Sequence, residues 1–495
     1  MQSTKTLIDQ LLTGNNLYNQ NIERWKFLYN SYIGGQAYRD AAYLTRYQLE
    51  TDSEYQARLN NTPLDNHCKS IISVYNSFLF RNEPSREYNS ITNLPELESF
   101  LEDADLEGRS FNAFMKEVFN WSAVFGHTWI IMSKPNIGAT TLAEEQAMNI
   151  RPYVSLLTPL VVLDWIWERG PCGCYELVYL KYVEDINGDI NILKEWTPIE
   201  IKTTEINAVD NIIQSEVIEV NELGKIPAVI AYSDRSIVRG LGISAITDIA
   251  DCQRFIYNSL SEADQSIRLD SHPSLVATPD TQIGTGAGSV IQIPENLDAG
   301  LKPYVLDFAG ANINSIYTVI DKTVESIEKM ANVGGVRTTE TRSQSGVALQ
   351  TEFQLLNARL SGFADNLELA EEQMWQLFCL YQMQPYDVVI DYPDSFQIKD
   401  AENEINQLQL AKNAATDPRI LQAIDAKILD WLELDEDEIT AIANPDLLDL
   451  EAVPEQEGLI YEPIEMIDPV SGIIIVTENE AQQLQLAKNG WVRNE

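Results

Sequence analysis

The apolar positions of residues 312–381 predict two long helices with a polar segment between them. The first run stops at Gly334-Gly335, and the second continues for about 35 residues, or roughly 50 Å of helix. Ser361-Gly362 lies in the middle of the second run, where we expect a kink at Gly362. The apolar side chains that share a helical face are Ile316, Val319, Ile320, Val324, Ile327 and Met330 in the first run, and Leu349, Phe353, Leu356, Leu360, Phe363, Leu367, Met374, Leu377 and Tyr381 in the second.

The segment between the two helices, residues 334–346, has almost nothing to bury. Arg337 and Arg342 are its only cations, and glycines bracket it. A polar loop between two long amphipathic helices fits a part that moves against something outside the core. On pattern alone, an ordinary helix–loop–helix in a large helical protein fits as well.

The chain before this pair divides into a helical part and a β part. Residues 1–60 read as helices with aromatic anchors, and a further helix follows over residues 65–80. Residues 94–133 predict helices and then a buried strand. Residues 152–232 have the pattern of strands, and Asn187-Gly188 is a strong turn signal for a hairpin between two of them.

A third long helix precedes the pair. The segment Gly240-Leu241-Gly242-Ile243-Ser244 opens a helical pattern that runs to about Asp270, and residues 273–303 read as short strands and loops. Beyond Pro385 the chain becomes strongly acidic, with two more helical stretches and a hairpin-like pattern over residues 466–476. The central order is therefore helix, small β insertion, helix, polar loop and long helix.

Composition narrows the class of protein. At 495 residues with 44% hydrophobic content, the chain can bury a sizeable core in more than one domain. No apolar run approaches the roughly 18 residues of a membrane span. The N-terminus lacks the apolar core of a signal peptide, so we expect the protein to be made and kept in a cytoplasm. Five cysteines in a chain of this length do not indicate a disulfide framework.

The net charge of −41, from 34 Lys and Arg against 75 Asp and Glu, argues against a basic nucleic-acid-binding surface. It is compatible with a protein that handles DNA without binding it tightly, because a ring lined by carboxylates would repel phosphate and let a duplex slide. The alternative is that the charge serves solubility alone.

The candidate catalytic and ligand-binding motifs lack the residues or the spacing that their chemistry requires. The run Gly284-Thr285-Gly286-Ala287-Gly288-Ser289 lacks the Lys and the following helix of a phosphate-binding loop, so we expect a flexible turn. Cys172-Gly173-Cys174 has no second ligand pair at zinc spacing. The three histidines form no motif with Ser or Cys; His67 falls in a helix, and we expect His127 in a turn. We therefore expect no catalytic, cofactor-binding or metal-binding residue.

The order of elements resembles the tailed-bacteriophage portal protein family, the head-to-tail connectors. The resemblance is most specific over residues 240–383, where the glycine-rich start at Gly240 and the Ser345-Gly346-Val347-Ala348-Leu349 junction match the family pattern. Less specific similarities are the Phe80-Arg81-Asn82-Glu83-Pro84 segment and the turn at Gly126.

The resemblance implies an α+β, mainly helical, portal-type fold with wing, stem, clip and crown, assembled as a ring. Its expected parts are an N-terminal wing part over 1–239, a first stem helix over 240–271, a clip over 272–311, a second stem helix over 312–333, a tunnel loop over 334–346, a long kinked wing helix and return over 347–396, a crown over 397–453 and an acidic tail over 454–495.

The resemblance also implies the function of a non-enzymatic ring, dodecameric in this family, at a unique capsid vertex. It would serve genome packaging, head–tail joining and genome ejection. Its partners would be other copies of the chain, double-stranded DNA, the terminase large subunit, a head–tail adaptor, and the major capsid and scaffolding proteins, with no membrane. The location would be the portal vertex of the virion, and the host cytoplasm during assembly. The expected site residues are Arg337, Thr338, Thr339, Glu340 and Arg342 in a DNA-facing tunnel loop, and Gly284, Gly286 and Gly288 at a clip edge that docks terminase or adaptor.

Two other classes remain open from the sequence. One is a carboxylate-based hydrolase, which needs two opposed carboxylates in a concave pocket. The other is a different structural virion or scaffold-like protein. A ring with a central hole would favour the portal, and a compact monomer would not.

Overall fold

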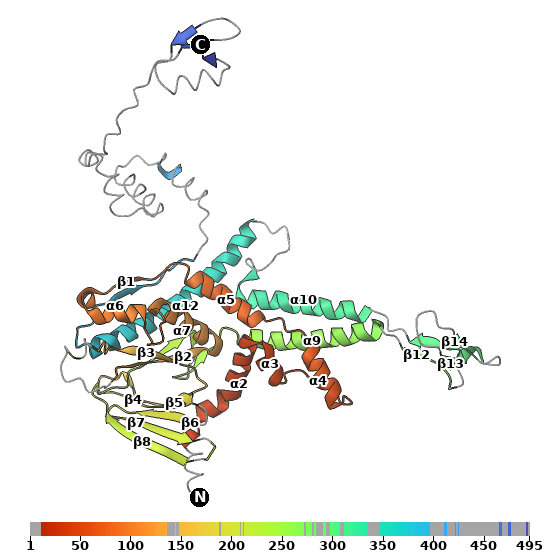
Figure 1. Cartoon of the computed structure of the whole chain (residues 1–495), viewed down its shortest axis with the longest axis horizontal. Helices are drawn as coiled ribbons and strands as arrows, with labels where there is room; N and C mark the ends of the chain where they lie inside the picture. The colour runs from red at the N-terminus through yellow and green to blue at the C-terminus, as the bar shows by residue number, and fades with distance from the viewer. Residues whose placement is uncertain are drawn as a thin grey trace. The chain divides into compact units, whose positions relative to one another are not determined.

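The computed structural model describes most of the first 396 residues and short stretches of the remainder (Figure 1). Contacts divide the chain into two compact units, Met1–Gln397 and Ile398–Glu495. The described residues are 11–135, 144, 148–187, 190–207, 209–210, 212–271, 274–279, 282–283, 291–293, 298–306, 311–334, 346–396, 410–412, 421, 424, 465–467, 474–476 and 492–493.

The first unit begins with helices, as its aromatic-rich pattern predicted. Capping side chains set several of their starts: Asn15 accepts a hydrogen bond from the Tyr18 amide at 2.7 Å, and Thr51 and Glu54 form a capping box. The helices are α2 (Asn16–Ile33), α3 (Gly35–Asp40), α4 (Asp52–Asn61), α5 (His67–Leu79), the 3-10 helix η1 (Asn89–Ile91), α6 (Pro95–Glu102) and α7 (Phe111–Phe125).

The core of the first unit lies between these helices and a three-stranded antiparallel sheet in the order β3-β2-β9. Helix α7 ends at Gly126, whose φ of +93° is left-handed, and the chain continues directly into β2 (His127–Ser133). The sequence predicted this change from helix to buried strand at Gly126, and it is confirmed. The partners of β2 are β3 (Tyr153–Leu157) and β9 (Ala228–Tyr232).

A five-stranded antiparallel meander in the order β4-β5-β6-β7-β8 follows. The predicted hairpin is confirmed, because Asn187 pairs with Ile190 across two residues. The sequence pattern did not identify β7, whose Glu-Ile-Lys-Thr-Thr-Glu-Ile-Asn sequence has only two apolar residues. The strands are β4 (Val162–Arg169), β5 (Tyr175–Asn187), β6 (Ile190–Trp196), β7 (Glu200–Asn207) and β8 (Ile212–Val220).

Two antiparallel helices, α9 (Thr247–Ser271) and α10 (Ala311–Ala331), pack along each other and leave the body together (Figure 1). Beyond their far ends are two small strand pairs, β12 (Ser274–Val276) with β15 (Tyr304–Leu306) and β13 (Gln282–Ile283) with β14 (Ile291–Gln292), and the 3-10 helix η2 (Ala299–Leu301). We call α9, α10 and these strands the arm. The predicted order of helix, β insertion and helix is confirmed.

The predicted start of the first arm helix at Gly240 is wrong by several residues. Gly240 has a φ of +82°, which a right-handed helix does not allow. The next residues instead form β11 (Gly242–Ile243), paired with β10 (Asp234–Arg235). The Ser244 hydroxyl then accepts a hydrogen bond from the Ile246 amide at 3.1 Å, and the helix begins at Thr247.

Helix α12 (Gly346–Tyr381) is continuous through Gly362, and its inner face fills the core beneath β9 and β2. The fully buried Glu371 on this helix receives Arg86 in two hydrogen bonds, Nε to Oε1 at 2.5 Å and Nη2 to Oε2 at 3.0 Å. The Tyr392 hydroxyl and the Trp375 indole also donate to Glu371, at 2.7 and 3.1 Å. This network ties α12 to the strand pair β1 (Ser85–Glu87) and β16 (Val389–Asp391).

The described part of the second unit contains a three-stranded sheet in the order β18-β17-β19. Glu465 pairs with Val476 and Ile467 with Ile474, so the predicted hairpin over residues 466–476 is confirmed. The strands are β17 (Glu465–Ile467), β18 (Ile474–Val476) and β19 (Val492–Arg493).

Candidate functional site: the arm and an arginine pocket

The base of the arm is held by polar side chains beneath the N-terminal helices. Gln253 of α9 is fully buried; its Oε1 accepts from the Cys68 amide at 2.9 Å, and its Nε2 donates to the Ser31 carbonyl at 3.0 Å. Arg24 donates through two nitrogens to the Asp251 carboxylate, at 2.8 and 3.1 Å. Buried polar groups cost free energy unless they are paired, so these contacts fix the place where α9 leaves the body.

A buried arginine of α4, Arg58, makes a further polar contact with α9. Arg58 donates to both carboxylate oxygens of Glu50 at 2.8 Å and to the Ser261 hydroxyl at 3.1 Å. The Arg58 guanidinium also lies over the ring of Tyr47, 4.0 Å from the ring centroid. The hydrogen bonds from Arg58 lower the pKa of Glu50. Together with Gln253 and Arg24, Arg58 therefore holds α9 against the N-terminal part of the chain.

The body end of α10 is also anchored. The buried Tyr75 hydroxyl donates to the Ala331 carbonyl at 2.5 Å, and the Val333 amide donates to the Glu328 carbonyl at 3.1 Å. Asn332 takes the left-handed conformation, with a φ of +56°, that commonly ends a helix. The predicted helix end next to Gly334 is confirmed within a few residues.

The arm carries apolar side chains that its own chain does not cover. Of the predicted apolar face of α10, Ile320 and Ile327 are buried in the core, but Val319 is 45% exposed. On α9 the ring of Phe255 is 50% exposed. The other large apolar side chains of α9 and α10 that remain at least one-third exposed are Ile267, Tyr317 and Met330. Large apolar side chains repeated along an exposed arm mark a surface that another polypeptide can cover.

The predicted tunnel-loop residues Arg337, Thr338, Thr339, Glu340 and Arg342 lie outside the described residues, as do Gly284, Gly286 and Gly288. Their assigned roles therefore stay predictions. Gly362 is described: it lies exposed on α12, its carbonyl accepts from the Asn366 side chain at 3.0 Å, and a Cβ placed on it would meet nothing within 4 Å. The kink at this position also stays a prediction.

His127 is the first residue of β2, not the turn residue that its preceding glycine suggested. It is fully buried, and its Nδ1 accepts a hydrogen bond from the Gly242 amide at 3.2 Å. Burial lowers the pKa of His127 to about 3. The ring is therefore neutral at physiological pH and serves to hold β11, which leads into the arm.

This burial predicts a pH dependence of stability. The folded pKa lies below the unperturbed value of 6.5, so the unfolded chain binds the proton more readily. The stability from neutral His127 is present above about pH 6.5 and is lost as the pH falls towards about 3. Between about pH 8 and pH 5, we expect the wild type to lose about 2 kcal/mol more unfolding free energy than His127→Gln, whose amide oxygen can accept the same bond. Chemical denaturation at each pH measures this difference, and equal pH profiles would contradict it.

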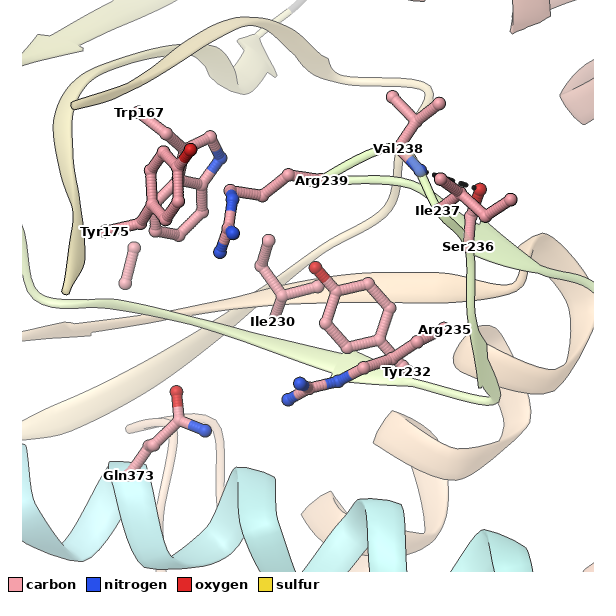
Figure 2. A pocket seen from close by; sticks show the side chains of 11 residues that line it. Trp167, Tyr175, Ile230, Tyr232, Arg235, Ser236, Ile237, Val238, Arg239 and Gln373 are labelled. Atoms are coloured by element: carbon pink, nitrogen blue, oxygen red, sulfur yellow. Dashed lines mark hydrogen bonds between the residues drawn. The ribbon is translucent and has the colours of Figure 1, made fainter. Parts of the chain in front are cut away.

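A cavity of about 320 Å³ lies where β4, β5, β9 and the segment around β10 approach α12 (Figure 2). The guanidinium of Arg239 lies 3.8 Å from the centroid of the Tyr175 ring, and that of Arg235 lies 5.2 Å from the Tyr232 ring. Trp167, Ser236 and Gln373 add further polar atoms to the lining. We call this cavity the arginine pocket; none of the residues that line it is an Asp or Glu.

Arg169 adds a third guanidinium beside the pocket, 4.8 Å from the Tyr175 ring centroid. Its hydrogen bond to the Tyr175 hydroxyl, together with the charge of Arg239, lowers the pKa of Tyr175. No pattern in the sequence had predicted this pocket. The available signal was the segment from Asp234 to Gly240, which places two arginines and the apolar pair Ile237-Val238 next to one another.

Within the described residues, no group of three or more His, Cys, Asp or Glu side chains is arranged to hold a metal ion. Cys172 and Cys174 are exposed free thiols in the turn between β4 and β5. The helices of the described part include none with the length and apolar content that crossing a membrane requires.

Comparison with known proteins found no matching family model and no matching curated protein. Solved structures with a similar chain trace include the following three. A chain from the neck of an empty gene transfer agent particle, computed with C6 symmetry, has 11% identity and a TM-score of 0.42, over 78% of this chain and 95% of that one. A chain from the virion of a native gene transfer agent particle has 10% identity and a TM-score of 0.42, over 78% and 97%. A chain from the neck of a native particle, computed with C12 symmetry, has 11% identity and a TM-score of 0.42, over 79% and 98%.

Proposed function

We propose that this chain is a phage portal protein. Copies of it would close into a ring, dodecameric in the family that its sequence resembles, at a unique vertex of a tailed-phage head. Double-stranded DNA would pass along the ring axis during packaging and ejection. The observation that carries the proposal is the arm, two antiparallel helices of 25 and 21 residues with a small β insertion, followed by the long helix α12.

The uncovered side chains of the arm supply a reason for assembly. Tyr317 and Val319 lie on α10 and Phe255 on α9, all substantially exposed in a single chain. Neighbouring arms standing side by side around an axis would bury them, at a gain of roughly 25 cal/mol per Å² of apolar surface removed from water. A ring built this way needs each copy to offer two different surfaces, one to each neighbour.

The loop after α10 is proposed to face the DNA channel. Arg337 and Arg342 would touch passing phosphates transiently or pair with carboxylates of the next subunit, while Thr338, Thr339 and Glu340 would line the same ring of contacts. A net charge of −41 supports weak contact, because a largely acidic lumen repels phosphate. An experimental structure of the ring with this loop on its outer surface would reject the assignment.

The small strands at the arm tip are proposed to form the clip, with Gly284, Gly286 and Gly288 at an edge that docks the terminase large subunit and then a head–tail adaptor. The major capsid and scaffolding proteins would meet other surfaces, and the working location would be the portal vertex. The packaging motor would be the separate terminase. No catalytic role is proposed, and a carboxylate-based hydrolase is disfavoured at the arginine pocket, which lacks the two opposed carboxylates that such chemistry needs.

Imaging of the purified full-length chain by negative-stain electron microscopy tests the proposal, with native mass spectrometry to count subunits. We expect rings with a central hole wide enough for a duplex. A compact monomer at every protein concentration would overturn the proposal.

Val319→Asp is the sharpest variant for the arm. A carboxylate at this position would be buried between neighbouring arms, so we expect the protein concentration at which rings form to rise at least about tenfold, equivalent to about 1.4 kcal/mol. Ile199→Asp, at a 77% exposed apolar position in the β6–β7 turn, is the matched control. Mass photometry across a dilution series measures both, and an equal effect of the two variants would contradict the arm as the assembly surface.

A further inference from the structure

We propose that the arginine pocket receives an Asp or Glu side chain from a second copy of this chain, and so forms part of the contact between neighbouring subunits. This inference rests on the proposed ring, and it assigns a second interface element on the body, apart from the arm.

The pocket has hydrogen-bond donors without matching acceptors. Among the described residues, neither Arg235 nor Arg239 forms an ion pair with a carboxylate. The buried Trp167 Nε1 has no hydrogen-bond partner within the described structure either. Such a donor costs free energy until an acceptor arrives. An anionic acceptor satisfies guanidinium and indole donors together, and a carboxylate matches the planar fork of arginine.

Aromatic neighbours restrict the arginine side chains of the pocket before any anion binds. Arg239 lies beside two rings, with its guanidinium 3.8 Å from the Tyr175 centroid and 5.8 Å from the Trp167 centroid. Figure 2 shows the Arg239 side chain directed towards these two rings, and the Arg235 side chain directed towards Gln373 of α12. Stacking on aromatic faces restricts the arginine before binding, so less conformational entropy is lost when a carboxylate arrives.

An apolar rim next to the pocket indicates a protein partner. Ile237 is completely exposed and Val238 is 42% exposed. The turn that presents them is ordered, because the Val238 amide donates to the Ser236 hydroxyl at 3.2 Å and the Leu241 amide donates to the Val238 carbonyl at 3.2 Å. Arginine, tyrosine and tryptophan beside exposed aliphatic side chains are the composition that protein interfaces enrich.

Charge complementarity favours another copy of the same chain as that partner. With 75 acidic against 34 basic side chains, each copy presents many carboxylates and few cations. The arginine pocket instead has Arg235 and Arg239 in its lining and Arg169 beside it, opposite in sign to the net charge of the chain. In a ring the pocket of one copy and a carboxylate of the next form a heterologous contact, which can repeat around the axis and close.

The test compares the full-length double variant Arg235→Glu/Arg239→Glu with the wild type by mass photometry over protein and salt concentration. We expect half-assembly to require at least about tenfold more protein, because like charges would then face each other. The control Lys69→Glu/Arg81→Glu makes the same change in net charge at two exposed positions of α5 and its C-terminal end. Thermal unfolding of each protein confirms that it is folded. Assembly of the double variant equal to that of the control would overturn the inference.

Photo-cross-linking keeps the inference testable if the double variant fails to fold. A benzophenone amino acid at the completely exposed Ile237 should link to a peptide containing Asp or Glu from a second copy. Links confined to the same copy in assembled rings would overturn the inference. Saturable binding of free glutamate or phosphate to a pocket that leaves assembly unchanged would identify a small-anion site and would also overturn it. If the wild type forms no ring at all, the proposed function itself fails.

Discussion

Replacing Glu371 by glutamine is expected to lower the free energy of unfolding of the first unit by about 3–5 kcal/mol. Glutamine keeps the shape of the side chain but removes the charge that compensates Arg86, whose side chain is only 8% exposed. An uncompensated buried guanidinium is among the costliest single defects in a folded protein. Denaturant unfolding followed by tryptophan fluorescence measures the change, since Trp375 donates directly to Glu371.

Glu372→Gln is the matched control, because Glu372 is the next residue of the same helix and lies nearer the surface. Arg86→Gln/Glu371→Gln should recover part of the loss, since it leaves no buried charge unpaired. If Glu371→Gln falls within about 0.5 kcal/mol of Glu372→Gln, the network does not stabilise the fold as inferred.

The same network shows why α12 is placed where it is. Burial and the charge of Glu371 raise the pKa of Tyr392 well above its usual value, so its hydroxyl remains a hydrogen-bond donor to the carboxylate. Strand β1 supplies Arg86 and the segment after β16 supplies Tyr392. Both therefore hold the C-terminal part of α12, around Glu371, against this strand pair.

The sequence could predict the helices of the arm because their periodicity is local. Apolar side chains such as Ile320 and Ile327 recur along one face, and both are buried. The pattern could not say which members of that face stay uncovered. Val319 belongs to the same predicted set and is 45% exposed, because a second helix covers only part of the stripe.

Long-range pairings carry no such local signal. Arg86 and Glu371 are 285 residues apart, and each lies among other charged residues in the sequence, so nothing local marks the two as partners. The arginine pocket likewise combines β4, β5, β9 and α12, so its members come together only in the folded chain. Strand β7 was missed for a different reason: its partners β6 and β8 determine its conformation more than its own polar sequence does.

The wrong helix start at Gly240 has a backbone cause. The segment from Gly240 to Ser244 was predicted to open a helix, but each of its two glycines lies in close contact with another part of the chain. A Cβ at Gly240 would enter the Trp165 indole, and one at Gly242 would collide with the Gly126 backbone. These glycines therefore allow a crossing of two backbone segments before the helix begins.

This crossing gives the second large effect, which we expect from Gly126→Ala. The new Cβ would lie 2.5 Å from the Gly242 carbonyl carbon and 2.7 Å from that of Ile243, both backbone atoms that cannot move away as side-chain ends do. A left-handed φ of +93° adds its own cost. About 1–2 kcal/mol for the backbone conformation and about 1–3 kcal/mol for overpacking give an expected loss of about 2–5 kcal/mol in unfolding free energy.

Gly173→Ala separates the two contributions. Gly173 has a similar φ of +84°, but a Cβ there would meet nothing within 4 Å, so only the conformational cost of about 1–2 kcal/mol should appear. The Ala245 amide donates to the Ala123 carbonyl at 2.9 Å beside the crossing, so Gly126→Ala should also weaken hydrogen-exchange protection where α9 begins. Equal losses from the two alanine variants, with unchanged exchange at Ala245, would show that the crossing does not hold the arm to the body.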